Sequence, residues 1–219
     1  MRRYTQLVSS SRYLIFLLLV VVGVACDLGT KHWVFSRLWP PTADKPPFLW
    51  LWQDHIGLQV SLNEGAVFGI GQGLVLWFAL FSILAVLGIL YWLFILGEAK
   101  DWWLTIALGG ITAGIFGNLY DRLGLHGLRW PAGMIGEHTP GTPIYAVRDW
   151  ILLQWNDAWR WPNFNIADSL LVIGAILLIW HAYIRGRPQN TSVSPEADGN
   201  ASLSVGHSEA TDCGEASAE

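Results

Sequence analysis

Two aspartates near the end of the chain stand among apolar and aromatic neighbours. Asp168 is the third residue of a mostly apolar segment, Ile166 to Ile184. Asp149 lies nineteen residues upstream, in Val147-Arg148-Asp149-Trp150. An ionised carboxylate at the edge of a lipid bilayer is costly and is usually kept for function. We therefore predict that these two side chains meet and share one proton.

Such a pair could activate water. Two carboxyl groups within hydrogen-bond reach cannot both ionise easily, so the pKa of one rises and the pair titrates as a unit. The ionised member can then take a proton from water while the protonated member donates to a carbonyl oxygen. This is aspartic peptidase chemistry. The sequence has no HExxH or GxSxG motif and no phosphate-binding glycine loop, and its six histidines lack metal-ligand spacing. We predict no cofactor and no metal.

The elements that position these acids are predicted to span a membrane. Of 219 residues, 53% are hydrophobic and only 14% are charged, whereas a soluble domain carries about 25% charged residues. Four apolar segments are predicted to form transmembrane helices. Each has close to the length that a helix needs to cross about 30 Å of hydrocarbon. They are about 13–35, 74–96, 102–120 and 166–184. In the third segment, small residues spaced four apart predict close helix packing.

The remaining segments are too polar or too broken by proline to span. Residues 48–62 are predicted to form short strands at the headgroup level, and residues 123–165 a long interfacial loop. Residues 188–219 contain six acids and no Lys or Arg and are predicted to be a disordered tail. The predicted fold is an all-α polytopic membrane protein with four transmembrane helices, a small extramembrane β element and an interfacial loop, with the membrane domain at 1–187.

The first apolar run has a second interpretation. Gly23-Val24-Ala25-Cys26 resembles the end of a cleaved signal peptide, and the cysteine resembles a lipoprotein cleavage site. Against this, the helical pattern continues beyond Cys26, and Asp27 and Lys31 have the favourable i,i+4 order with the acid first. We predict a transmembrane helix that ends at about Trp33.

Charge placement predicts the orientation. Four spans put both termini on one side, together with Arg2, Arg3, Arg12, Lys100, Arg185 and Arg187. The positive-inside rule makes that side cytoplasmic. The following polar residues then collect near the outer face: Asp27, Asn63, Asn118, Arg122, Asp149, Asn165 and Asp168.

Five motifs in this order resemble the lipoprotein signal peptidases (signal peptidase II), which are bacterial intramembrane aspartic endopeptidases. They are Asp27-x-x-x-Lys31, Asn63-x-Gly65-Ala66-x-Phe68, Gly117-Asn118-x-x-Asp121-Arg122, Val147-x-Asp149 and Phe164-Asn165-x-Ala167-Asp168. The resemblance covers Tyr13 to Ile184. Two features depart from it: the connection between Arg122 and Val147 is longer than the family usually shows, and the acidic tail has no obvious counterpart.

The resemblance implies a role for each matching residue. Asp149 and Asp168 would be the catalytic dyad. Substrate-binding residues would be Asn63, Gly65, Asn118, Arg122 and Asn165, and supporting residues Asp27, Lys31, Asp121 and Ala167. The implied partners are diacylglyceryl-modified prolipoproteins, cut just before the modified cysteine, and membrane lipid. We expect a monomer in the bacterial cytoplasmic (inner) membrane, with no nucleic-acid partner because no basic stripe is present.

Structural interpretations compete with these roles. Asn165 and Asp168 have the spacing of a helix N-cap and its N3 residue, Asn63 could make an Asx-turn, and Asp121 is expected to pair locally. Asp27 and Lys31 could be scaffold only. The rival functions are a proton-coupled carrier, which predicts acids at mid-bilayer facing each other across inverted repeats, and a membrane assembly factor without catalysis.

Overall fold

A computed structural model describes residues 8–42, 48–65, 74–132, 138–156 and 158–186. Three parts of the predictions lie outside these residues: the motif positions Ala66 and Phe68, the basic residues Arg2, Arg3 and Arg187 of the orientation prediction, and the tail 188–219. The domain division at residue 187 therefore stays a prediction.

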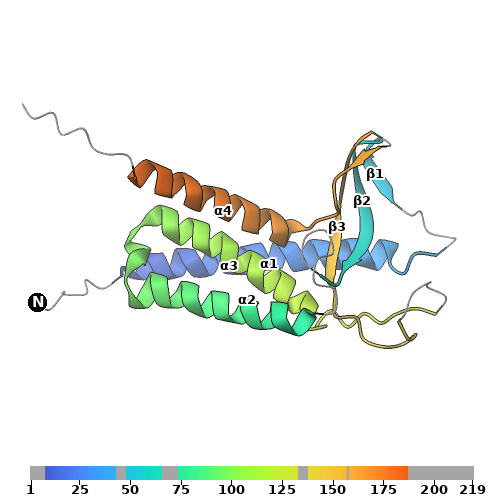
Figure 1. The fold of residues 1–219 in the computed structure, drawn as a ribbon, viewed down its shortest axis with the longest axis horizontal. Helices are drawn as coiled ribbons and strands as arrows, with labels where there is room; N and C mark the ends of the chain where they lie inside the picture. The colour runs from blue at the N-terminus through green and yellow to red at the C-terminus, as the bar shows by residue number, and fades with distance from the viewer. Residues whose placement is uncertain (1–7, 43–47, 66–73, 133–137, 157, 187–219) are drawn as a thin grey trace, which may run out of the picture. The chain divides into compact units, whose positions relative to one another are not determined.

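Four helices are long and apolar enough to cross a membrane within the described part of the chain. They are α1 (Ser10–Leu38), α2 (Val75–Leu90, continued by a π-helical turn, Tyr91–Ile95), α3 (Trp102–Arg122) and α4 (Ile166–Arg185) (Figure 1). The predicted four spans are confirmed. α1 passes through Cys26 without a break, in agreement with the helical interpretation, and it ends at Leu38 instead of Trp33.

The additional turn of α1 supports the extramembrane part of the protein. Val34 and Leu38 are buried in one apolar cluster with Leu58, which lies on a strand of the sheet described below. Burial of such side chains contributes roughly 1.5–3 kcal/mol each. This packing explains why α1 continues beyond the apolar run seen in the sequence.

Helix α3 is the centre of the helical layer. It packs against α1, α2 and α4, and its small residues allow close approach. A Cβ atom on Gly114 would lie 2.5 Å from the Ala167 carbonyl oxygen, and a Cβ atom on Gly117 would overlap the Asp27 carboxylate. The predicted close packing is confirmed. It brings polar groups of α1 and α4 against the same end of α3.

An antiparallel sheet lies at one end of the helices, and its strands run across the helix axes (Figure 1). Its order is β1 (Leu49–Trp52), β2 (Ile56–Asn63), β3 (Val147–Asn156) and β4 (Trp159–Arg160). The β element predicted at 48–62 is confirmed. The prediction of a loop throughout 123–165 is wrong, because β3 and β4 lie within it. Val147, Arg148 and Asp149 are all buried, so β3 lacks the alternation of polar and apolar residues that marks a half-buried strand.

Candidate active site

Asp149 is the third residue of β3, and its side chain is 2% exposed. It is paired with Ser61 on β2, and the register shifts immediately beyond this pair. There, the backbone N–H groups of Trp150 and Ile151 donate to the Phe164 carbonyl oxygen at 3.0 and 2.8 Å. Irregularities of this kind turn a strand and redirect its side chains. This one brings the segment before α4 next to Asp149.

Asp168 is oriented by the N-terminus of α4. Asn165 is the N-cap residue: its side-chain oxygen accepts the Asp168 N–H at 2.9 Å, and Asp168 Oδ2 accepts the Asn165 N–H at 3.2 Å. This reciprocal capping box confirms the structural interpretation of the pair. It leaves Asp168 Oδ1 to accept a hydrogen bond from Asn118 Nδ2 at 2.8 Å. One carboxylate oxygen of Asp168 therefore caps the helix, while the other contacts Asn118 in the site.

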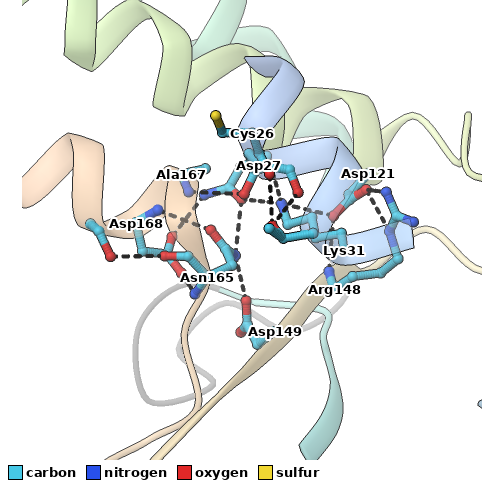
Figure 2. Close-up of polar contacts among 12 residues, drawn as sticks. Cys26, Asp27, Lys31, Asp121, Arg148, Asp149, Asn165, Ala167 and Asp168 are labelled. Carbon is cyan, nitrogen blue, oxygen red and sulfur yellow. Dashed lines mark hydrogen bonds and ion pairs between the residues drawn. The ribbon is translucent and has the colours of Figure 1, made fainter. Parts of the chain in front are cut away.

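Asn165 links the two acids (Figure 2). Its side-chain nitrogen donates to Asp149 Oδ1 at 2.6 Å and to Asn118 Oδ1 at 3.2 Å, while its backbone N–H contacts Asp168. Neither Asp149 nor Asp168 belongs to an ion pair among the described residues. The two carboxylates thus share a neutral hydrogen-bond partner, and direct sharing of a proton stays a prediction.

Asn63 reaches Asp149 from the end of β2. Its Nδ2 donates to Asp149 Oδ2 at 3.2 Å, and its Oδ1 accepts the Gly65 N–H at 3.1 Å. The second contact is the Asx-turn of the structural interpretation, and it fixes the amide so that its donor faces the acid. The Gly65 carbonyl oxygen accepts from Arg122 at 3.3 Å. Both contacts of Gly65 are therefore made by its backbone, through the N–H group and the carbonyl oxygen.

The environment of Asp149 raises its pKa to about 7. Burial is the largest cause, and the charge of Asp168 adds to it; hydrogen bonds from Asn165 and Asn63 act in the opposite direction. A carboxyl group with a pKa close to the working pH can both donate and accept a proton. Perturbations of this kind are concentrated at functional sites.

A buried ion-pair network lies beside the two acids. Lys31 Nζ contacts Asp27 Oδ2 at 2.8 Å, Asp121 Oδ2 at 3.0 Å and Asn118 Oδ1 at 3.1 Å. The predicted pairing of Asp27 with Lys31 is confirmed. The expectation that Asp121 pairs locally is wrong, since its partners are Lys31 on α1 and Arg148 on β3. The packing of α1 and of β3 against α3, and not sequence neighbourhood, supplies those partners.

A cavity of about 1020 Å³ connects these groups. Asp149, Asp168, Asn63, Asn118 and Arg122 form part of its wall. Apolar side chains line it where it meets the helices: Ile115, Leu171, Val172 and Ile173. Polar groups and an apolar surface in one cavity suit a substrate that has both a peptide bond and alkyl chains. Within the described residues, no three His, Cys, Asp or Glu side chains lie close enough to hold a metal ion.

The other predicted residues lie behind this wall. Asn165, Asp27, Lys31 and Asp121 are fully buried, and the Ala167 N–H donates to Asp27 Oδ1 at 2.9 Å. Arg148 was not predicted as a site residue and was named only as the neighbour of Asp149. Strand alternation could have found it, because Arg148 must point to the opposite face of β3 from Asp149.

Comparisons with known proteins show what the chain is similar to. The family model described as "Signal peptidase (SPase) II" matches residues 19–184. A lipoprotein signal peptidase of Rhodopirellula baltica is 45% identical over 192 residues, covering 87% of this chain and 79% of the relative. One from Rhodococcus jostii is 31% identical and covers 85% of this chain and 81% of the relative. A solved bacterial membrane enzyme matches the fold with a TM-score of 0.58 at 23% identity, covering 80% of this chain and 93% of that one.

Proposed function

This chain belongs to the signal peptidase II family of lipoprotein signal peptidases, and on that premise we propose that Asp149 and Asp168 are its catalytic dyad. The substrate would be a prolipoprotein, cut just before its diacylglyceryl-modified cysteine. The observation that carries this proposal is the pair of carboxylates on one cavity wall, linked by Asn165 and outside the ion-pair network. Membership of a peptidase family also decides against the carrier and the non-catalytic assembly factor.

In the proposed mechanism the dyad holds one proton, and we assign it to Asp149 because burial raises the pKa of that carboxyl group to about 7. Asp168 removes a proton from water as the water oxygen attacks the scissile carbonyl carbon. Asp149 donates its proton to the carbonyl oxygen, which gives a neutral tetrahedral intermediate. When the C–N bond breaks, Asp168 returns its proton to the leaving nitrogen, and Asp149 recovers one from the intermediate.

The rest of the cavity would position the substrate. The Arg122 guanidinium lies 5.3 Å from the centre of the Phe78 ring and donates to the Gly65 carbonyl oxygen, so its remaining donors could bind substrate carbonyls. The apolar side chains of α3 and α4 would contact the acyl chains. Anchoring of those chains in lipid supplies proximity, because the scissile bond is then held at the depth of the dyad.

Cleavage of matched precursors tests the substrate assignment. We expect the purified protein in lipid vesicles to cleave a diacylglyceryl-modified prolipoprotein, and to cleave the same precursor without the lipid at least about 100-fold more slowly, because the unmodified peptide loses this positioning. Product masses identify the bond that is cut. Equal turnover of both precursors, or cleavage at another bond, would contradict the proposed substrate.

The protein is a multi-pass membrane protein, and we propose that both termini are cytoplasmic, which puts the dyad near the outer face. Arg12, Lys100 and Arg185 all lie at the same end of the four helices, and this shared position supports the orientation. Reporter fusions truncated after Gly97, Gly127 and Gly186 test it. We expect a phosphatase that is active only outside the cytoplasm to work after Gly127 alone. Phosphatase activity after Gly186 would show that the orientation is the opposite of the proposed one.

A further inference from the structure

We propose that Arg148 is a positioning residue for the dyad: it holds the strand that carries Asp149 against α3, and it balances the charge of the buried network beside the site. The inference rests on the proposed roles of Asp149 and Asp168. Arg148 lies next to Asp149 in the chain but on the other face of β3, so it would act without touching substrate.

A single carboxylate holds both the side chain and the backbone of Arg148. Asp121 Oδ1 accepts from Arg148 Nε at 2.9 Å and from Arg148 Nη2 at 2.8 Å, and Asp121 Oδ2 accepts the Arg148 backbone N–H at 3.0 Å. Arg148 is 4% exposed and Asp121 is fully buried. Both guanidinium nitrogens contact one carboxylate oxygen while the backbone N–H contacts the other, so Asp121 fixes the side chain and the backbone of Arg148 together. A rotation of β3 about its axis would break all three, and the same rotation would turn Asp149 away from Asp168.

The other acid of the dyad is held in a parallel way. The residue before Asp168 is Ala167, whose N–H donates to Asp27 Oδ1 at 2.9 Å. Lys31 Nζ then contacts both Asp27 and Asp121. Figure 2 shows the resulting chain of contacts, which runs from Arg148 through Asp121, Lys31 and Asp27 to Ala167. The relative position of the two dyad acids therefore depends on both ends of this chain.

Arg148 also completes the charge balance. In the ionised forms that these ion pairs require, Asp27 and Asp121 carry two negative charges, and Lys31 and Arg148 carry two positive charges, so the buried set is neutral. Without Arg148, an uncompensated negative charge would remain near Asp149 and favour its protonated form. Three other charged groups around Asp149 stay the same in the variants below: Asp168 on α4, Arg122 on α3 and Glu64 after β2. His126, after α3, responds to the charges of Asp121 and Arg148 themselves, which shift its pKa in opposite directions.

The test is the pH dependence of prolipoprotein cleavage, measured per mole of folded enzyme. For the unsubstituted protein, activity should fall above pH of about 7, where Asp149 loses its proton. We expect Arg148→Met to lower kcat about 100-fold with KM nearly unchanged, because the dyad is displaced. The pH at which activity falls on the alkaline side (the alkaline decline) should also rise by roughly one pH unit. This is the size expected when one charge near Asp149 is left unbalanced at an effective dielectric constant of about 20.

Two further variants separate geometry from charge. Arg148→Lys keeps the charge but lacks the planar fork, so the alkaline decline should return to its original pH while kcat recovers only in part. The double variant Asp121→Asn/Arg148→Met leaves Asp27 and Lys31 as a neutral pair, so it should restore the pH of the decline but not kcat. Both variants remain informative if Arg148→Met does not fold.

Arg129→Met is the matched control, since Arg129 contacts the Gly141 carbonyl oxygen in an exposed position. It should leave kcat and the pH profile unchanged. The inference would be overturned if the Arg148 variants lowered only thermal stability, with kcat and the alkaline decline equal to those of the unsubstituted protein. Failure of the proposed function would look different: Asp149→Asn would then retain activity, whatever the Arg148 variants did.

Discussion

We expect Asp149→Asn and Asp168→Asn each to reduce cleavage of a diacylglyceryl-modified prolipoprotein by at least about 10³-fold, within the range by which general acid–base groups accelerate reactions. The amide keeps the shape of the carboxyl group but cannot exchange a proton with water or with the substrate. Because the proposed mechanism gives each acid a different half of the proton transfer, either substitution alone should be enough.

The folded state should survive these substitutions. An amide oxygen at residue 149 can still accept from Asn165 Nδ2, and one at residue 168 can still accept from Asn118 Nδ2. Asp54→Asn is the matched control, because Asp54 is exposed in the turn between β1 and β2 and has a φ of 60°, which Asn tolerates. Its cleavage rate should be unchanged. Turnover near the original rate in both dyad variants would refute the proposed chemistry.

The second large effect is on stability. We expect Lys31→Met to lower the free energy of unfolding by about 3–5 kcal/mol, the range observed when one partner of a buried ion pair is removed. Lys31 has three buried partners, and its loss leaves the Asp27 and Asp121 carboxylates with only Arg148 to balance them. Denaturant unfolding in detergent micelles measures the change.

Lys100→Met provides the comparison, because Lys100 is exposed in the turn between α2 and α3. Its effect should stay within about 0.5 kcal/mol, as for most surface substitutions. If Lys31→Met were as stable as Lys100→Met, the network could not be holding α1, α3 and β3 together. The account of Arg148 would then lose its mechanical basis as well.

The helices were predictable because their signal is local. In a bilayer, an uncharged run such as Leu74 to Leu96 forms a helix, because every backbone polar group must find its hydrogen-bond partner within the same segment. The Asp27–Lys31 pair and the capping box of Asn165 and Asp168 were predictable for the same reason, since both follow from helical spacing. The order and spacing of five motifs also predicted the family, and the comparisons confirm it.

The sheet shows where local signals fail. The start of β3 is buried on both faces, since Arg148 contacts Asp121 on one side and Asp149 contacts Asn165 on the other. A strand buried in this way has no polar and apolar alternation, so the sequence indicated a loop. The missed strand is the element that orients Asp149.

By itself, the sequence determined the four spans, the Asp27–Lys31 pair and the family, because each depends on composition or on the order and spacing of short motifs. The tertiary structure decided the rest. Asp121 pairs with Lys31 and Arg148 across 90 and 27 positions of the chain, and Asn165 rather than a direct contact links Asp149 to Asp168. Such partners are set by how closely α1 and α4 pack on the glycines of α3, and packing between distant segments leaves no periodic trace in the sequence.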